Sequence, residues 1–399
     1  MLRPEYFDTA ADDIITLYNK LTESGIEDIC RRIARFGKIT KSSRWQVERL
    51  EEAGALYEDI IKSIAAKTGK SDQAVLKLFE EASVKSIRYD DAIYKAAGLS
   101  PLPLRQSPAM LETLQAGLTK TGGIMRNLTL TTAVTSQQAY IQACDLAYMQ
   151  VSSGLMSYNT AIARAVVAAS AAGLTVLYPS GHTDKLDVAI RRAVLTGVNQ
   201  TCAQMQLARA DDMGCDLVET TAHNGARPSH AEWQGEVFSR SGTSRKYRPF
   251  SVTGYGTGPG LCGWNCRHSF FPFFEGLSLP AQDAETVEGY KDAPAGVFAG
   301  VAYTVYEATQ KQREIERRIR SKRQVLVGLN AAIEETPDIS ELREEFEIQS
   351  AKLKAMESKL REFCKATGQV VDTARIQKLG FGRSVSQKAV HAAKRRNKR

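Results

Sequence analysis

The β signature of this chain lies in CDLVETTA at residues 215–222, GEVFSRSG at 235–242 and RHSFFPFF at 267–274. Each segment is rich in β-branched or aromatic residues and has glycine or proline nearby, which is typical of short strands. The proline of the third segment predicts an edge strand, because proline cannot donate a hydrogen bond to a neighbouring strand. SVTGYGTGPGLCG at 251–263 precedes the third segment, and its glycines predict repeated turns of the backbone.

Outside this segment the chain has helical patterns. In SSRWQVERLEEAGALYEDIIKSIAAKTGK, residues 42–70, apolar side chains recur at intervals of three and four, which predicts an amphipathic helix. Ser42 or Ser43 is available as its N-cap, and Gly69 is its expected end. GLSPLPLRQSP at 98–108 predicts a linker, because its three prolines cannot lie inside a helix.

The C-terminal part returns to a helical pattern from about Pro294. YEATQKQREIERRIRSKRQVLVGLNAAI at 306–333 and SELREEFEIQSAKLKAMESKLREFCKATG at 340–368 predict two helices, joined at Thr336 and Pro337 by a cap and a first-turn proline. Apolar side chains of the second helix are spaced by about 3.5 residues, the pattern of a coiled hairpin. The sequence therefore predicts an α+β fold that is predominantly α-helical, with a small glycine-rich β segment and a C-terminal helical hairpin.

Residues 101–180 contain six charged side chains among many Ala, Ser, Thr and Gln residues. Helices with so few charges either lie inside the fold or form a surface for a partner subunit, and the sequence leaves both open. AVVAASAAGLTVLY at 165–178 predicts a buried helix and no membrane contact, because it is shorter than the roughly 20 residues of a membrane span. Five regions are predicted: an N-terminal helical region at 1–100, a central low-charge helical region at 101–214, the β segment at 215–293, the helical hairpin at 294–374 and a basic tail at 375–399.

The formal net charge of +8 is a property of the tail. Residues 375–399 hold nine Lys or Arg and no Asp or Glu, which leaves 44 basic and 45 acidic residues in 1–374. A disordered tail with this charge would bind double-stranded DNA through its phosphates by counterion release, without reading sequence. The alternative is a solvated tail that aids solubility. The predicted DNA contacts are Lys394, Arg395, Arg396, Lys398 and Arg399.

The seven cysteines are odd in number and mostly scattered, which predicts reduced thiols. The N-terminal residues MLRPEYFDTAADDII are acidic where a secretory signal would be basic and then apolar, so we expect a cytosolic site of synthesis. Cys262, Cys266 and His268 lie within seven residues, and His230 or His223 could complete a tetrahedral structural zinc site. The alternative is two small buried thiols with hydrogen-bonded histidines. No other cofactor is predicted.

Catalytic arrangements in this segment are few. His230 with Glu219 or Glu232 could act as a base with its carboxylate, and Cys262 or Cys266 could be a nucleophile beside His268. The chain contains neither a nucleophile-elbow nor a nucleotide-binding motif, so we predict that it is not an enzyme. Aromatic side chains of the segment are expected to form its core, with stacking on single-stranded nucleic acid as the alternative. They are Trp233, Trp264, Phe270, Phe271, Phe273 and Phe274.

Two strings of the β segment, GARPSHAEWQG at 225–235 and GLCGWNCRHSFFPF at 260–273, resemble the phage minor capsid protein 2 family. That family is itself similar to the Mu F-like head morphogenesis proteins. The flanking sequences fit the layout of the family, including YEATQKQREIERRIR at 306–320 and ARIQKLGFGRS at 374–384.

The resemblance implies a structural virion protein of a tailed phage or prophage. Such a protein would be a minor head component that associates with the portal and other head proteins, lies near packaged DNA and acts in head morphogenesis. It would occupy the capsid interior or portal region, and the host cytoplasm during assembly. The alternatives are an effector enzyme or toxin delivered with the particle and a DNA-binding accessory protein that is not incorporated.

Overall fold

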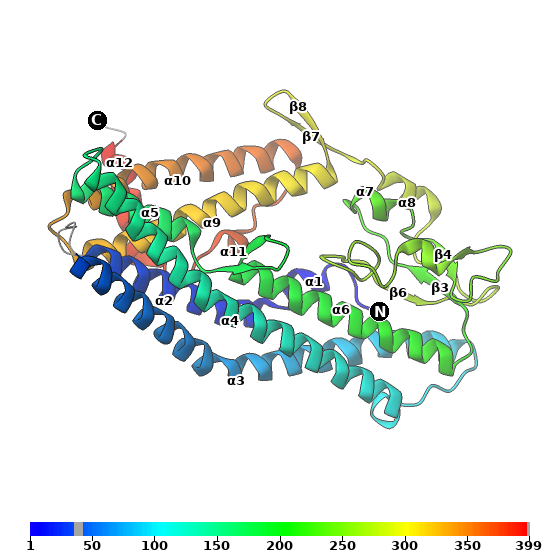
Figure 1. Ribbon diagram of the computed structural model, residues 1–399. Helices are drawn as coiled ribbons and strands as arrows, with labels where there is room; N and C mark the ends of the chain where they lie inside the picture. Colours follow the sequence, from blue (N-terminus) through cyan, green and yellow to red (C-terminus); the bar gives the residue numbers. More distant parts are fainter. Residues whose placement is uncertain (36–42, 397–399) are drawn as a thin grey trace. The chain divides into compact units, whose positions relative to one another are not determined.

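The computed structural model describes residues 1–35 and 43–396, and the side chains of residues 43–46 are not among its described features. The predicted N-caps Ser42 and Ser43 and the predicted DNA contacts Lys398 and Arg399 therefore lie outside the described residues or side chains. Most of the described chain is helical and its sheets are small (Figure 1), which confirms the predominantly α-helical α+β class.

The helices account for most of the chain. They are α1 (Tyr6–Thr9), α2 (Asp12–Arg35), α3 (Ser43–Ala96), α4 (Pro108–Ser152), α5 (Tyr158–Ala172), α6 (Leu186–Asp212), α7 (Pro228–Ala231), α8 (Ala284–Gly289), α9 (Val305–Glu335), α10 (Ser340–Thr367), α11 (Thr373–Ile376) and α12 (Arg383–Arg396), with short 3-10 helices η1 (Leu104–Gln106) and η2 (Phe250–Thr253). The proline-rich linker is confirmed, since α3 ends at Ala96 and α4 begins at Pro108.

The strands form a central four-stranded sheet and two hairpins. They are β1 (Thr175–Leu177), β2 (Thr183–Lys185), β3 (Leu217–Thr220), β4 (Val237–Ser239), β5 (Arg248–Pro249), β6 (Phe270–Pro272), β7 (Pro294–Phe298) and β8 (Val301–Thr304). In the central sheet the order is β5-β4-β3-β6, with β3 antiparallel to β4 and β6, and β5 parallel to β4. All three predicted strands are therefore confirmed, and Pro272 lies on an edge strand as expected.

Three local predictions are wrong. The helix expected at 165–178 ends at Ala172, because Gly173 has a φ of 57°, and residues 175–177 then pair with 183–185 as a hairpin. The helix expected from about Pro294 begins at Val305, after the β7–β8 hairpin. Gly69 does not end α3, since one glycine inside a helix costs only about 1 kcal/mol and the buried Val75, Leu78 and Phe79 anchor the turns that follow.

The basic tail is also not disordered over the residues described. Residues 383–396 form α12, whose buried Val385, Ala389, Ala392 and Ala393 make one apolar face. This face is narrow and made largely of alanine, so its helical periodicity was hidden among basic residues. Helix α12 packs on α10.

The described chain divides into two compact units, each built from three separate stretches. Unit 1 comprises Met1–Ile15, Gly69–Arg126 and Ile190–Thr309, and it contains the central sheet. Helices α4 and α6 approach closely in this unit at two matched positions. A Cβ at Gly117 would overlap the Thr201 side chain, and a Cβ at Gly197 would overlap Thr121. Each helix thus accommodates a threonine of the other over a glycine.

Unit 2 comprises Thr16–Thr68, Asn127–Ala189 and Gln310–Arg399. Its α9 and α10 run side by side in the yellow and orange part of Figure 1. An ion pair of 2.7 Å between Arg323 and Glu357 joins these two helices. The predicted break at Thr336 and Pro337 separates them, although α10 begins only at Ser340 and has Ile339 at its N-cap. The coiled-coil character of this hairpin stays a prediction.

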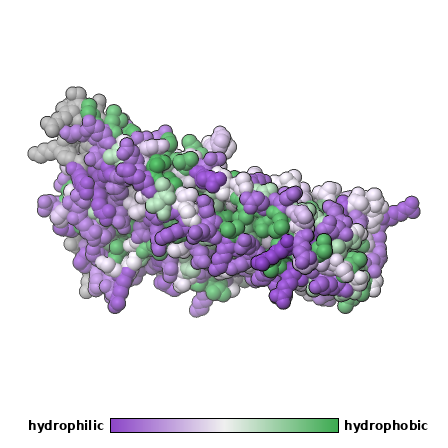
Figure 2. Space-filling model, turned by 90° about the horizontal axis from the view of Figure 1, so that it is seen from below, coloured by the Kyte–Doolittle hydropathy of each residue, from purple (hydrophilic) through white to green (hydrophobic). Residues whose placement is uncertain are grey.

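Helix α4 is only partly covered along its length. Six of its large apolar side chains are exposed, namely Leu111, Ile124, Leu130, Val134, Leu146 and Met149. Figure 2 shows apolar side chains among hydrophilic ones on one face of the molecule. No helix of the described residues has a stretch that is long and apolar enough to cross a membrane.

The close approach of α4 and α6 predicts a position-specific cost for adding one methyl group. Gly117→Ala should lower the free energy of unfolding by about 1–3 kcal/mol, because the new Cβ collides with Thr201. Gly123→Ala is the matched control on the same helix, where a Cβ meets nothing within 4 Å. It should be neutral or stabilising by up to about 1 kcal/mol, through higher helix propensity. Equal effects of the two variants in denaturant titrations would contradict this packing.

Candidate functional site

The first element of the site is the short helix α7, which carries His230. Arg227 precedes a proline and has an extended backbone, and Pro228 occupies the first turn, where its missing N–H costs nothing. The backbone N–H of His230 donates to the carbonyl of Arg227 at 2.8 Å. These local preferences turn the His230 side chain into the interior of unit 1, where it is 2% exposed.

The second element is the glycine-rich loop that precedes Cys266. A Cβ at Gly260 would overlap the carbonyl of Gly254, and a Cβ at Gly263 would overlap that of Gly258. The loop therefore folds back on its own backbone, and larger residues are excluded at both glycines. A hydrogen bond of 2.6 Å from the N–H of Trp264 to the carbonyl of Gly258 closes it.

Helix α6 anchors the segment that carries Cys266 and His268. The amide of Asn199 donates to the carbonyls of both residues at 3.2 Å. Seven residues later on the same helix, Gln206 donates to the carbonyl of Phe270 at 2.6 Å. The two amides thus satisfy backbone acceptors in a segment that is buried from water.

The aromatic residues of the β segment form a core, as predicted, with one exception. Trp233, Phe238, Phe250 and Phe270 pack in one buried cluster that also contains Cys262 and Cys266. Phe271 and Phe273 are also buried, and Phe274 is partly buried against a second cluster that contains Tyr94. Trp264 is 60% exposed, so the expectation of a core position was wrong for that residue.

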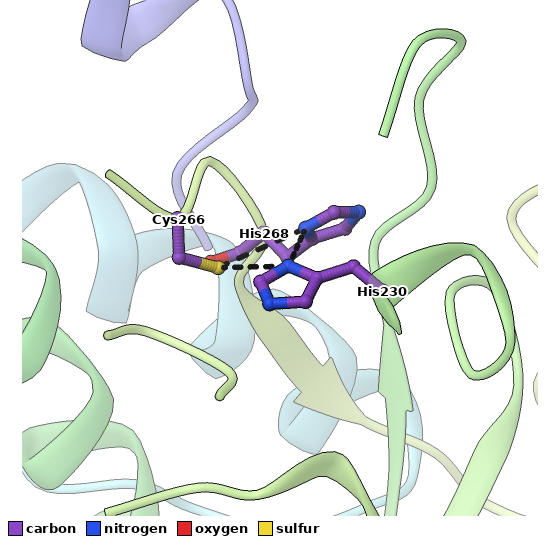
Figure 3. A group of neighbouring side chains, drawn as sticks. All are labelled: His230, Cys266 and His268. Carbon is purple, nitrogen blue, oxygen red and sulfur yellow. Dashed lines mark hydrogen bonds between the residues drawn. The ribbon is translucent and has the colours of Figure 1, made fainter. Parts of the chain in front are cut away.

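Three of the four predicted zinc ligands come together in this core (Figure 3). The Nδ1 atoms of His230 and His268 are 3.3 Å apart, and the Cys266 Sγ lies 3.8 Å from the first and 3.7 Å from the second. Cys262 is not part of this group, in which the ligand atoms lie within 4.8 Å of one another. Its Sγ lies 3.7 Å from the carbonyl oxygen of His268, an acceptor that the Cys266 Sγ also approaches, at 3.8 Å. The φ of Cys262 is 58°, a left-handed conformation that is unusual for a residue with a Cβ.

His223, the other histidine considered for the site, lies beside the group. Its ring stacks on that of His268 with 4.5 Å between centroids, and its Nδ1 lies 3.0 Å from the carbonyl oxygen of Asn224.

Burial controls the protonation of these side chains. It lowers the pKa of His230 and holds the pKa of His268 well below its usual value, with nearby positive groups adding to the effect at His268. Burial also raises the pKa of the Cys266 thiol and raises that of Cys262 well above its usual value. The imidazoles are therefore neutral and the thiols protonated, and a protonated thiol is a poor nucleophile.

The carboxylates considered as catalytic partners have other positions. Glu219 is buried and its Oε1 accepts a hydrogen bond of 2.8 Å from the N–H of Ala281. Glu232 is exposed. Arg227, the residue before α7, donates to the carbonyl of Trp264 at 2.9 Å.

The comparison that decides the family concerns nearly the whole chain. The sequence model of phage minor capsid protein 2 matches residues 2–365. The chain belongs to the phage minor capsid protein 2 family. A second comparison finds a structural protein of Lactococcus phage LL-H, 23% identical over 300 residues that cover 72% of this chain and 78% of the relative. No solved structure matches the chain.

Membership of the phage minor capsid protein 2 family confirms the resemblance noted in the β segment. The matched residues 2–365 include α7, the glycine-rich loop and β6, and they end before α11 and α12. The His–Cys–His group thus lies within the part of the chain that matches the family, and the basic C-terminal helix lies outside it.

The predicted DNA contacts lie at the end of α12. Lys394, Arg395 and Arg396 are exposed in its last turn, where positive charge is favoured by the helix dipole. Within the described part of the tail, four basic residues form ion pairs with upstream acids, at 2.7–3.4 Å. These are Arg375 with Asp372, Lys378 with Asp187, Lys388 with Glu334, and Arg395 with Glu347.

Several groups that position the site had no sequence signal. Asn199 lies in a helical stretch that contains other polar side chains, such as Gln200 and Gln204. Nothing in the sequence distinguishes Asn199 from them. The carbonyl of Pro259 is within 2.7 Å of the Nε2 of His230, and a backbone acceptor is invisible in a sequence. These contacts depend on the tertiary fold.

Glu219 predicts a pH dependence of stability for unit 1. Burial raises its pKa from 4.5 to about 7. Because the folded state binds this proton more tightly than the unfolded state, the contribution is fully present below about pH 4.5 and is lost as the pH rises through about 7. Glu219→Gln keeps the oxygen that accepts from Ala281 and should raise the thermal midpoint at pH 8.5 relative to the native chain, but not at pH 5.

The matched control for Glu219 is Glu232→Gln, which removes an exposed carboxylate from the same segment. It should leave the midpoint nearly unchanged at both pH values. If Glu219→Gln gave the same shift at pH 5 and pH 8.5, an ionisation penalty at this site would be excluded.

Proposed function

We propose that this chain is a minor head component of a tailed phage or prophage, that it associates with the portal and other head proteins, and that it acts in head morphogenesis. The observation that carries this proposal is the family match over residues 2–365. Its place would be the capsid interior or portal region of the virion, after assembly in the host cytoplasm.

The exposed apolar side chains of α4 support contacts with other head proteins. Large exposed apolar residues grouped on one element commonly mark protein–protein contact sites in soluble proteins. Leu130, Val134, Leu146 and Met149 are exposed on a helix with four charged residues in 45. A surface with few charges loses little solvation when a partner covers it.

A structural role without catalysis fits the chemistry of the buried group. Neither thiol is poised as a nucleophile, because burial favours the protonated form of each. Glu219 and Glu232 make no base–carboxylate pair with His230 among the hydrogen bonds of the described residues. We therefore propose that the protein is not an enzyme.

DNA contact is proposed for the end of α12 and the residues that follow it. Within the described residues, Lys394 and Arg396 are exposed and lack an acidic partner, whereas Arg395 pairs with Glu347 at 3.0 Å. Together with Lys398 and Arg399 they would form a short positive cluster. Such a cluster binds phosphates without base contacts, and its affinity falls steeply with salt.

The head assignment predicts that purified, DNA-filled particles contain this chain. Mass spectrometry should find its peptides at a few copies per particle, and chemical cross-linking should join it to the portal. Particles from a host strain in which the gene is interrupted serve as the control. Absence of its peptides at a sensitivity that detects the portal would overturn the assignment.

The DNA proposal predicts a charge-specific loss of binding. Lys394, Arg396, Lys398 and Arg399 are changed together to Gln, which leaves the apolar face of α12 intact. Duplex affinity should fall, and each lost phosphate contact should lower the slope of log affinity against log salt by about 0.9. Fluorescence anisotropy at several salt concentrations measures both quantities.

The control for the DNA experiment removes four positive charges from elsewhere. Lys352, Lys354, Arg361 and Lys365 are exposed on α10 and are changed together to Gln. This variant has the same net charge as the tail variant and should keep most of the affinity and the salt slope. Equal losses in the two variants would show that net charge, and not the tail, determines binding.

A further inference from the structure

The hydrogen-bond partner of His230 fixes which of its ring nitrogens carries the proton. Its Nε2 lies 2.7 Å from the carbonyl oxygen of Pro259. A carbonyl can only accept a hydrogen bond, so Nε2 must be the N–H of the ring. In the neutral ring the Nδ1 then has no hydrogen and presents a lone pair.

The same argument applies to His268, through a side-chain amide. Its Nε2 lies 3.2 Å from the Oε1 of Gln234, and this oxygen also accepts a hydrogen bond of 3.0 Å from the backbone N–H of His223. The backbone donor fixes the orientation of the amide, since the opposite orientation would place an NH₂ group against an N–H. The Nε2 of His268 therefore donates, and its Nδ1 also presents a lone pair.

Two lone pairs thus face each other across 3.3 Å, with the Cys266 sulfur beside both. Two acceptors cannot form a hydrogen bond with each other, and the thiol has one proton for two nitrogens. Protonating an imidazole would supply a hydrogen but would place a positive charge in the interior, where both rings are 2% exposed. A bound cation satisfies all three donor atoms at once.

The separations of the three atoms match those expected around a tetrahedral zinc ion. Zinc bonds of about 2.0–2.1 Å to nitrogen and about 2.3 Å to sulfur, at tetrahedral angles, place two nitrogens about 3.3 Å apart and a nitrogen and a sulfur about 3.6 Å apart. The observed separations are 3.3 Å for the nitrogens and 3.7 and 3.8 Å for the nitrogen–sulfur pairs.

We propose that His230, Cys266 and His268 hold a zinc ion through Nδ1, Sγ and Nδ1, and that Cys262 is a packing residue outside the ligand set. Imidazole and thiolate are the ligands that zinc prefers, and the Cys266 thiol releases its proton to solvent when the ion binds. The ion joins α7 to the segment that leads into β6. This inference goes beyond the proposed role in the phage head and does not depend on it.

The surroundings of the ligands agree with a metal site. Histidine ligands of zinc commonly donate their second ring nitrogen to a carbonyl or a side-chain oxygen, and Pro259 and Gln234 provide these acceptors. The backbone on either side of the ligands is held by Asn199. The strands of the central sheet have two to four residues each, so a metal would add stability that short strands lack.

The test measures zinc in the full-length protein, purified under reducing conditions and then equilibrated with Zn²⁺ and desalted. Elemental analysis should find one zinc per chain. Cys266→Ser should lose the metal, while Cys262→Ser, the matched control in the same buried cluster, should retain it. Substoichiometric zinc in the native chain, or full zinc in Cys266→Ser, would overturn the proposal. Equal loss in both variants would overturn the three-ligand assignment.

Measurements on the native chain separate loss of the metal from misfolding of a variant. Removing zinc with a chelator should lower the thermal midpoint, and adding Zn²⁺ should restore it, with little change in helical circular dichroism. Replacing zinc with Co²⁺ should give the visible bands of a tetrahedral site with a thiolate charge-transfer band, which Cys262→Ser keeps and Cys266→Ser lacks. A native chain whose stability is indifferent to chelator and whose Co²⁺ complex shows no thiolate band would contradict the site.

Discussion

The structure of unit 1 depends on burying residues 266–270 between helix α6 and the central sheet without losing their backbone hydrogen bonds. Asn199 and Gln206 meet this requirement from one face of α6, by donating to the carbonyls of Cys266, His268 and Phe270. An unpaired buried carbonyl costs about 1–3 kcal/mol, so these two amides determine where the segment can lie. Once it is in place, Cys266 and His268 are buried, at 7% and 2% exposed, and their chemistry is that of a protein interior.

The glycine-rich loop supplies the other half of the arrangement. Its backbone can fold back only because Gly260 and Gly263 have no Cβ, and this path brings the carbonyl of Pro259 to the ring of His230. The loop therefore orients a side chain on α7, about thirty residues earlier in the sequence. The glycines act through geometry and not as a phosphate-binding loop, which agrees with the absence of a lysine in GYGTGPG.

Local patterns were sufficient for the elements of the site but not for its contacts. Strands β3, β4 and β6 follow from β-branched and aromatic runs, and Pro272 correctly indicates an edge. The different positions of Cys262 and Cys266 could not be predicted, because they depend on a φ of 58° at Cys262 that spacing does not encode. Helix α12 was missed for a related reason. Its apolar face is made largely of small alanines, and the helix is stabilised by packing on α10. Tertiary contacts decide such cases, and sequence periodicity records them weakly.

Burial favours the neutral form of the thiols, of the imidazoles and of Glu219 near the site. The thiols are kept protonated, the imidazoles neutral, and the pKa of Glu219 is raised to about 7. Thiols held in this form are poor nucleophiles, and the two imidazole Nδ1 atoms stand opposed inside a hydrophobic cluster. A hydrophobic core tolerates polar atoms only when each has a partner. The opposed nitrogens therefore need a shared partner, and the proposed zinc ion would supply it while joining α7 to the segment that leads into β6.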